Sequence, residues 1–344
     1  MAKKIWLMGL LMLALIMVGC QQGKTPPVQT GIQPEPGAVL TQVSGYGDVA
    51  ISKPHTYKNM SLFVLYRTVK ETAIPEDFIT LEEGLAQQKV VVSEKEQAEV
   101  RTLQVENLSN KPLFLQVGDV LKGGKQDRTI QVSITIPSGS GKVDVPSLCV
   151  EQSRWTGQVQ FSAASNSANS NALKIAIQKG EQGEVWKEVA EFKNKAEKIT
   201  GEQSKTSSLN EAIDNEKMKQ TCAEYETAFT KLLDQYPNAI GVAYALNGKI
   251  QAVELFQMNG LLRRAYPKLL KAYANEAVVN QSVGEIKVLN NDEVKGFLVE
   301  MEKGETKQQN IKDNQITLLE NDRGLSKEVM DEQKRVMHRQ YLQK

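Results

Sequence analysis

The sequence is poor in the residues that most often carry metal binding and nucleophilic catalysis. It contains only two histidines, His55 and His338, and three cysteines, Cys20, Cys149 and Cys222. No HExxH or CxxC spacing occurs, which argues against a transition-metal site. A GxSxG nucleophile elbow is also missing, so a histidine-dependent triad would have to use one of the two histidines. We therefore expect no metal and no cofactor.

An excess of charge of one sign is missing as well. The chain has 42 Lys and Arg residues against 41 Asp and Glu residues, a net charge of +1. Removing residues 1–19, which carry Lys3 and Lys4, keeps the balance near neutral. A near-neutral balance gives no electrostatic case for binding nucleic acid, so we expect no nucleic-acid partner.

One long apolar run is present, and it lies at the N-terminus. Lys3 and Lys4 precede apolar residues 5–18, a run shorter than the roughly 20 residues that span a bilayer. This pattern is typical of a signal peptide. The run ends at Gly19 and Cys20, which resemble the lipobox of bacterial lipoproteins. We expect residues 1–19 to be removed and Cys20 to carry the lipid; the alternatives are an ordinary signal peptide cut near Gly19 and a short uncleaved anchor.

The segment after Cys20 is polar and rich in proline. Residues 20–38 contain four prolines, which predicts an extended tether ahead of one domain over residues 39–344. The protein would thus be exported and anchored to membrane lipid in the bacterial cell envelope. Gln21, in place of aspartate, resembles lipoproteins that pass to the outer membrane where the envelope has two. The remaining Cys149 and Cys222 form either one disulfide or two small buried apolar groups.

The first half of the domain has the pattern of a β-rich fold. Alternation and β-branched residues predict strands at residues 61–67, 89–92, 100–105, 113–117, 129–136 and 143–150, with a short helix at 79–87. In residues 129–136 the apolar residues alternate with Thr129, Gln131, Ser133 and Thr135, which predicts one buried face and one wet or functional face. The polar residues 162–171 predict a mobile loop.

The second half has helical periodicity around a single β-hairpin. Residues 184–199 predict a helix, and a longer one begins at Ser208, with Glu211 completing a capping box, and ends at Pro237. Asn247-Gly248 between two apolar runs predicts a hairpin with a type I′ turn. A helix at 261–277, kinked or restarted at Pro267, follows, then a helix at 292–301 and strands at 315–320 and 336–342. The predicted fold class is α+β, with a β-rich N-terminal half in a mixed or antiparallel sheet, followed by helices enclosing a β-hairpin.

The segment GGKQDR, residues 123–128, is the first candidate site. A phosphate loop is excluded because Gln126 stands where a magnesium-binding hydroxyl is required and a strand, not a helix, is expected next. The glycines suit a turn. Gln126 and Arg128 would share a strand face and can both form two-pronged hydrogen bonds to amides, carboxylates or phosphates. Lys125 and Asp127 add a cation and a carboxylate.

The segment CVEQSRW, residues 149–155, is the second candidate site. Glu151 and Arg154 either form an internal salt bridge with Trp155 covering the sheet edge, or line a pocket. In a pocket, arginine would hold an anion, glutamate would bind a hydroxyl or act as general base, and tryptophan would stack on the ligand. If the two strands are neighbours, both segments meet at one end of the sheet.

The order of five segments resembles one known family. TLEEGLAQQKVVVSE, NLSNKPLFLQVGDVLKGGKQDR, VPSLCVEQSRW and VAYALNGKIQAVELF, followed by LLRRAYPKLLKAYANEA, are similar to the ARPP domain, the ADP-ribosylglycohydrolase and rhodanese-phosphatase-superfamily-associated protein domain. The similarity covers about residues 45–342. It implies a broad link to ADP-ribose or nucleotide-related processes, and the family takes its name from gene association.

These observations leave three hypotheses for function. The first is a lipid-anchored protein that binds an anionic or hydroxyl-rich small ligand, or a protein partner, through Lys125, Gln126, Arg128, Arg154 and Trp155. The second is a hydrolase with Glu151 or Asp127 as general base and Arg128 stabilising negative charge. The third is a purely structural envelope lipoprotein in which internal salt bridges occupy all of these groups.

Overall fold

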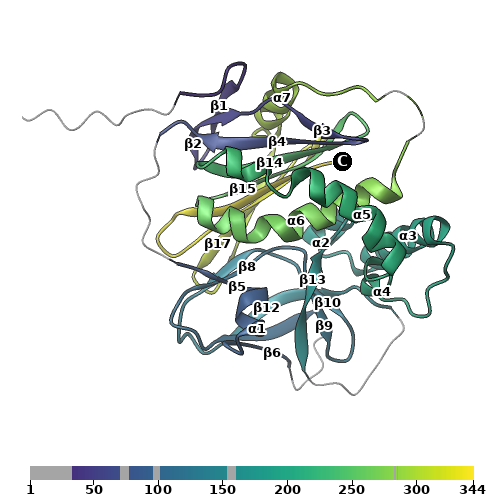
Figure 1. Ribbon diagram of the computed structural model, residues 1–344. Coiled ribbons are helices and arrows are strands. Elements are labelled where there is room, and N and C mark those ends of the chain that lie inside the picture. The colour runs from purple at the N-terminus through teal and green to yellow at the C-terminus, as the bar shows by residue number, and fades with distance from the viewer. Residues whose placement is uncertain (1–32, 70–76, 96–100, 153–159, 283, 285) are drawn as a thin grey trace, which may run out of the picture.

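The fold is that of a computed structural model, which describes residues 33–69, 77–95, 101–152, 160–282, 284 and 286–344. Its strands form one large sheet and two smaller ones, and its helices lie mostly in the second half of the chain (Figure 1). The predicted α+β class is confirmed, and every strand pair is antiparallel except one.

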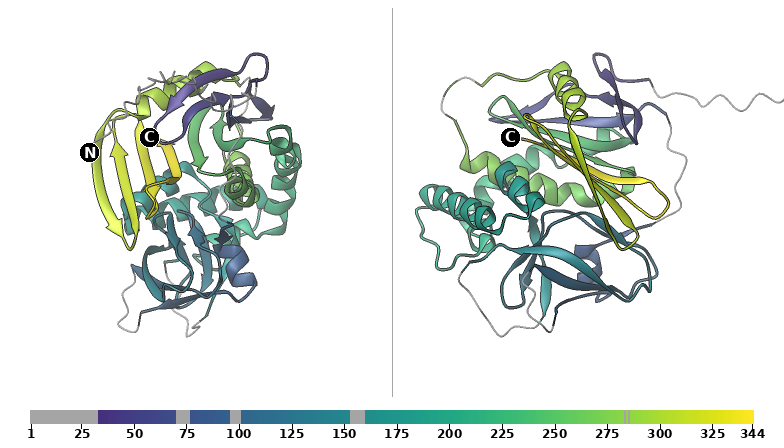
Figure 2. Two further views of the ribbon diagram at one scale, coloured as in Figure 1. Left: turned by 90° about the vertical axis from the view of Figure 1, so that its left-hand side faces the viewer. Right: turned by 180° about the vertical axis from the view of Figure 1, so that it is seen from behind.

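The large sheet has ten strands drawn from both ends of the chain. Its order is β1-β2-β4-β14-β15-β19-β18-β17-β16, with β3 paired to β4. The strands are β1 (Val39–Val43), β2 (Gly47–Ile51), β3 (His55–Tyr57), β4 (Met60–Arg67), β14 (Ala239–Leu246), β15 (Lys249–Phe256), β16 (Glu305–Ile311), β17 (Asn314–Glu320), β18 (Gly324–Met330) and β19 (Val336–Gln343). Figure 2 shows the C-terminal strands extending the sheet beside the central hairpin.

The smaller sheets come from the middle of the chain. Six strands have the order β13-β9-β10-β12-β7-β6, and three have the order β11-β8-β5, where β5 and β8 are parallel. These strands are β5 (Ile79–Thr80), β6 (Val90–Glu94), β7 (Thr102–Asn107), β8 (Leu113–Leu115), β9 (Asp119–Gly123), β10 (Arg128–Ile130), β11 (Ile134–Ile136), β12 (Lys142–Cys149) and β13 (Phe161–Ser167).

The helices cover the sheets and fill the space between them. They are α1 (Leu81–Ala86), α2 (Asn171–Lys179), α3 (Gln182–Thr200), α4 (Leu209–Ile213), α5 (Glu216–Phe229), α6 (Asn259–Val279) and α7 (Asn291–Met301), with a 3-10 turn at Leu232–Gln235. Helix α6 crosses between the large sheet and the six-stranded sheet, and α7 lies against the opposite face of the large sheet (Figure 1).

Both faces of the central strands of the large sheet are buried, and strand alternation assigns their residues to two cores. On β4, Leu62 and Val64 belong to a core shared with the smaller sheets, while Phe63 and Leu65 face the core under α7. This explains why β4 and β14 are nearly continuous apolar runs. The shared core also contains Ile130 of the six-stranded sheet, so one hydrophobic cluster joins the sheets.

The predicted hairpin is confirmed. Strands β14 and β15 pair through a turn in which Asn247 has a φ of 50° and Gly248 a φ of 72°. Helix α6 runs as one helix through Pro267, so the predicted restart there was wrong. Cys149 and Cys222 are both buried and not bridged. Burial, the largest cause, raises the pKa of the Cys222 thiol to about 12.

Three local predictions were wrong because tertiary contacts override local pattern. The predicted strand at 129–136 divides into β10 and β11, in different sheets, and Thr129, Ser133 and Thr135 are buried, not wet. The predicted mobile loop at 162–171 contains β13, which pairs with β9.

The third concerns the predicted helix start at Ser208. Ser208 caps only the short helix α4, and its side chain accepts from the Asn210 amide. The Glu211 carboxylate accepts instead from the backbone of Lys205 and Thr206, so no capping box forms. A new helix, α5, starts after Asn215.

Candidate functional site

The GGKQDR segment forms a tight turn between β9 and β10. Gly123 and Gly124 have φ values of 112° and 59°, which favour glycine. A Cβ atom at Gly123 would meet the Gln160 carbonyl, and one at Gly124 would meet the Phe161 ring. Both glycines are therefore required by the turn and by the close approach of β13. Strand β10 follows, as expected when the phosphate loop was excluded.

The two predicted segments do meet, because β10 pairs with β12. Arg128 lies directly opposite Cys149 in the register. The Arg128 guanidinium contacts the Cys149 sulfur, and the Gln126 Oε1 atom accepts from that thiol at 3.2 Å. Gln126 Nε2 donates to the Glu151 carbonyl at 3.0 Å. Gln126 lies in the turn and not on the strand face predicted for it, but it and Arg128 both touch Cys149.

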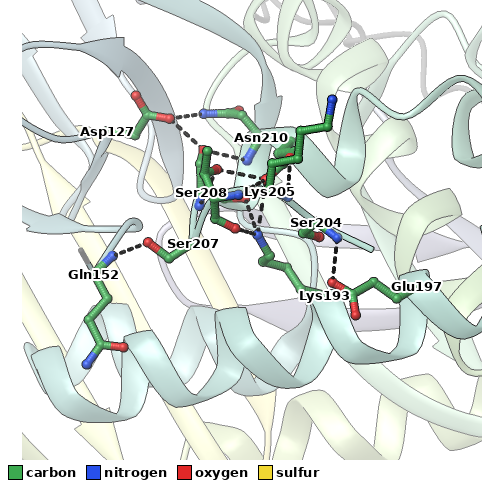
Figure 3. Close-up of polar contacts among 11 residues, drawn as sticks. Asp127, Gln152, Lys193, Glu197, Ser204, Lys205, Ser207, Ser208 and Asn210 are labelled. Atoms are coloured by element: carbon green, nitrogen blue, oxygen red, sulfur yellow. Dashed lines mark hydrogen bonds and ion pairs between the residues drawn. The ribbon is translucent and has the colours of Figure 1, made fainter. Parts of the chain in front are cut away.

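Asp127 connects this turn to helix α4. Its Oδ1 atom accepts from the Gly123 amide at 3.0 Å. Its Oδ2 atom accepts from the Ser208 hydroxyl at 2.8 Å and from the Asn210 side-chain amide at 2.9 Å. Figure 3 shows this arrangement. Because both oxygens receive donors from different elements, Asp127 joins β9, β10 and α4.

The acidic partner of Arg128 is Glu94, a residue that sequence reasoning missed. Glu94 Oε1 lies 3.1 Å from the Arg128 guanidinium and 3.1 Å from the Lys125 backbone nitrogen. Lys125 Nζ lies 3.8 Å from the other Glu94 oxygen. Glu94 ends β6 at the far edge of the six-stranded sheet, and nothing in its local sequence indicates that it folds back to this turn.

The described part of this cluster is buried and engaged internally. Asp127 is 4% exposed, Arg128 2% and Glu151 1%, and Glu151 Oε2 accepts from the Asp127 amide at 3.3 Å. Burial raises the pKa of the Cys149 thiol, although Arg128 opposes the shift, so the thiol form is favoured over the nucleophilic thiolate. These buried contacts are suited to holding the turn and its neighbouring strands together. Arg154, Trp155 and the lipidation residue Cys20 lie outside the described residues.

A second polar cluster surrounds His338 between the large sheet and the β10–β11 segment. His338 Nε2 lies 2.9 Å from Glu254 Oε2, and His338 Nδ1 lies 3.0 Å from the Ser133 hydroxyl. The order serine, histidine, carboxylate is that of a catalytic triad. Ser133, however, is 5% exposed and already accepts from the Val117 amide. Because the Ser133 hydroxyl is enclosed in this way, a substrate cannot reach it. The cluster is therefore a buried hydrogen-bond network.

The described residues also form a cavity of about 530 Å³ that sequence reasoning did not identify. It lies between α2, α3, the β14–β15 turn, the end of α6 and the C-terminal end of β19. Its lining combines apolar side chains with amides and both signs of charge, among them Asn171, Ala172, Glu188, Glu191, Phe192, Lys195, Leu246, Asn247, Ile250, Glu276, Asn280 and Lys344.

Asn171 and Glu276 form the polar wall of this cavity. The Asn171 backbone nitrogen donates to Glu276 Oε1 at 3.0 Å, and the Asn171 side-chain nitrogen donates to the Gln343 carbonyl. Asn171 is 8% exposed, and its Oδ1 atom is buried with no hydrogen-bond partner among the described residues. Burial raises the pKa of Glu276, although the Asn171 amide opposes the shift, so this carboxyl group stays protonated to a higher pH than a free glutamate does.

The wall on α3 carries an ion pair and a half-buried carboxyl group. Lys195 Nζ lies 2.8 Å from Glu191 Oε1 and donates to the Asn280 side chain at 3.1 Å. The pKa of Glu188 is raised by burial and by the neighbouring Glu191 carboxylate. The pairing of Glu191 with Lys195 leaves this wall without a strong charge of either sign.

Some of these residues carried a weak signal in the sequence. Asn275 and Glu276 interrupt an apolar run in a helix, and a polar pair inside such a run indicates buried polar contacts. Asn171 carried no such signal, because it lies in the polar segment that predicted a loop.

Two further observations concern metals and membranes. Across the described ranges, no three His, Cys, Asp or Glu side chains gather closely enough to hold a metal ion. None of the helices that the structure describes has the length and apolar character needed to cross a membrane.

Comparison with known proteins places the chain in a family. No curated protein and no solved structure matches it. Residues 48–342 match the model of one family, described as the ARG and Rhodanese-Phosphatase-superfamily-associated Protein domain. The match includes both candidate segments, GGKQDR and CVEQSRW, and all the described residues that line the 530 Å³ cavity except the last two of the chain. Because it spans most of the sequence, the chain belongs to this ARPP-1 family.

Proposed function

We propose that this protein is a lipid-anchored protein of the bacterial cell envelope whose ARPP-1 domain binds a hydroxyl-rich small ligand in the 530 Å³ cavity. The observation that carries the ligand proposal is the unpartnered Oδ1 atom of Asn171, a cavity-lining residue whose backbone nitrogen donates to the Glu276 carboxyl group. An unsatisfied buried acceptor costs about 1–3 kcal/mol, which a ligand donor would recover.

A hydroxyl group matches this pair of side chains. Asn171 Oδ1 can only accept a hydrogen bond, whereas a protonated Glu276 carboxyl can donate one. A hydroxyl both donates and accepts, so adjacent hydroxyls on one ligand can serve both residues. Phe192, Leu246 and Ile250 supply apolar surface on which the carbon skeleton of such a ligand can pack.

The charges around the cavity favour a neutral ligand over a phosphorylated one. Glu188, Glu191 and Glu276 line it, and Lys195 is already paired with Glu191. Lys344 is paired with Glu320 at 2.9 Å. Lys249 is the lining lysine left without an ion pair among the described residues, and the three carboxyl groups oppose a phosphate, so we expect sugars and polyols to bind more tightly than ADP-ribose or AMP.

Blocking the cavity tests the ligand proposal. Ala172 is exposed on α2 and lines the cavity, so Ala172→Trp fills the space without removing a hydrogen bond. Ala223→Trp on α5, also exposed, is the matched control. Thermal shift of the full chain against mono- and disaccharides, polyols, AMP and ADP-ribose should give a sugar or polyol hit that Ala172→Trp abolishes and Ala223→Trp retains. The proposal fails if no sugar or polyol shifts the melting temperature, or if a hit survives Ala172→Trp.

The anchor proposal rests on the N-terminal segment that ends at Gly19 and Cys20. Mass spectrometry of the protein from its native envelope should show the lipid mass on Cys20, and Cys20→Ser should lose it. Release of the protein from membranes by Cys20→Ser would agree with this result. An unchanged mass would overturn the anchor without touching the ligand proposal.

For the GGKQDR cluster, the geometry supports a structural role over a hydrolase. Both Asp127 oxygens already accept hydrogen bonds, and Glu151 is 1% exposed. A general base must reach its substrate within hydrogen-bond distance, which a carboxylate enclosed in this way does not do. Arg128→Ala should therefore lower stability and leave sugar or polyol binding at the 530 Å³ cavity unchanged.

A further inference from the structure

A second cavity, of about 410 Å³, lies at the C-terminal end of α2, whereas the first adjoins its N-terminal part. It is enclosed by the end of α2 and by strands β16, β17 and β18. Its lining includes Gln131, Gln178, Lys179, Glu181, Lys307, Gln308, Glu320 and Lys327. The two cavities share no lining residue, and one ion pair, between Lys344 of the first and Glu320 of the second, links them.

Lys327 differs from the other buried lysines in its partners. Lys174 lies 3.3 Å from the Glu254 carboxylate, and Lys193 lies 3.5 Å from that of Glu211. Lys327 is 7% exposed and donates to the Gln178 backbone carbonyl at 2.7 Å. Among the described residues, no carboxylate lies within ion-pairing distance of it. Its ammonium form is thus buried without a compensating charge.

Burial without an anion changes the state of the amine. Desolvation lowers the pKa of Lys327 to about 7. About half of the molecules then carry a neutral amine at neutral pH, whereas an exposed lysine with a pKa near 10.4 is almost wholly protonated. A neutral amine has a lone pair and is the nucleophilic form in lysine chemistry.

Gln178, whose backbone carbonyl binds this amine, also carries a buried side-chain acceptor. Its side-chain Oε1 atom is buried and has no hydrogen-bond partner among the described residues, and Gln178 is 3% exposed. Its backbone carbonyl holds Lys327 Nζ, and the residue lines the same cavity. An acceptor in this position can receive a hydrogen bond from a hydroxyl or from an iminium N–H group.

We infer that Lys327 is a covalent attachment site for a small aldehyde or ketone, which enters the 410 Å³ cavity and forms a reversible imine. The Nζ lone pair attacks the carbonyl carbon, the C=O π electrons move to oxygen, and proton transfer from nitrogen to oxygen gives a carbinolamine. The nitrogen lone pair then forms the C=N bond while the C–O bond breaks. Oxygen leaves as water with the remaining N–H proton and the hydroxyl hydrogen, so no oxidant or reductant is needed.

Reductive trapping tests this inference on the full chain. Propanal and sodium cyanoborohydride at pH 7 convert an imine to a stable propyl amine, and peptide mapping by mass spectrometry locates it. We expect Lys327 to be labelled about tenfold or more faster than exposed Lys249 and Lys307, because far more of it is neutral. Raising the pH to 10 should remove most of this advantage.

Two variants separate the site from general reactivity. Lys327→Met should abolish the fast labelling, and Lys307→Met, in the same cavity but exposed, should retain it. Lys327 labelling no faster than that of Lys249 at pH 7 would overturn the inference, and this measurement needs only the unmutated protein. Equal labelling rates for all lysines across the pH range would do the same.

Discussion

Asp127 shows how much stability one buried side chain can carry in this fold. Asp127→Ala removes the acceptors for the Gly123 amide, the Ser208 hydroxyl and the Asn210 amide, and leaves these donors buried. We expect it to lower the free energy of unfolding by about 2–4 kcal/mol. Urea denaturation measures the change. Asp322→Ala, at an exposed turn, should change stability by less than about 0.5 kcal/mol, and equal effects of the two would contradict the role of Asp127.

The buried amine of Lys327 gives a pH-dependent stability. Between pH about 7 and 10.5 the unfolded chain binds a proton on this side chain that the folded chain does not, so raising the pH favours folding. Lys327→Met removes the cost of burying the charge. Its stability gain over the unmutated protein should be largest at or below pH 7 and shrink by up to about 1.4 kcal/mol per pH unit above it.

The matched control for this pH effect is Lys307→Met. Lys307 is exposed and lines the same cavity, together with Lys179, Glu181 and Glu320. Because the Lys307 side chain is exposed, its substitution relieves no burial of charge, and Lys307→Met should lack the gain in stability expected of Lys327→Met. A constant difference for Lys327→Met would mean that its amine stays protonated in the folded protein.

At the scale of elements, a glycine-to-alanine substitution should lower stability in the β14–β15 turn and raise it in helix α7. Gly248 has a φ of 72°, and an added Cβ would lie 2.6 Å from the Lys287 carbonyl oxygen. Gly248→Ala should therefore cost about 1–3 kcal/mol. Gly296 lies exposed inside α7 with open space around it, so Gly296→Ala should stabilise by about 0.5–1 kcal/mol. Thermal unfolding of both variants checks the signs, and the same sign for both would contradict the turn geometry.

The same elements show what the sequence could predict. Asn247-Gly248 has a local physical cause, the positive φ angles of a tight turn, and its hairpin was predicted correctly. The prediction that GGKQDR and CVEQSRW lie side by side was also confirmed. It could be made because consecutive strands tend to pair. Strand β13 was missed, since SAASNS gains its extended form from β9 and not from its own propensity.

The cavity residues were harder to predict than the elements. Asn171 and Glu276 are 105 positions apart and meet only because α2 packs against the end of α6. Glu94 reaches Arg128 in the same way, from a strand at the sheet edge. Such long-range contacts leave no period or spacing in the sequence, which is why the proposed ligand site emerged from the fold alone.

For the whole molecule, the shared core predicts that the sheets unfold together. Leu62 of the large sheet and Ile130 of the six-stranded sheet belong to the same buried cluster. Ile130→Ala should cost about 2–5 kcal/mol and shift the near-UV and far-UV circular dichroism transitions by the same amount. Val299→Ala, at a side chain 45% exposed, should leave both nearly unchanged. Separate transitions for the two signals would show that the sheets unfold independently.

Strand β16, at one edge of the large sheet, affects whether neighbouring molecules can associate edge to edge. Residues Glu305 to Asn310 are all exposed, and the strand reads ETKQQNI, with a single apolar residue at its end. Unpaired backbone groups on an open edge can form hydrogen bonds with a strand of another molecule. Charged side chains such as Glu305 and Lys307 make this pairing unfavourable. We propose that the protein is held on a membrane, where neighbouring copies can be crowded. There the charged side chains of this edge strand would prevent β-strand pairing between copies, and so prevent the growth of fibres.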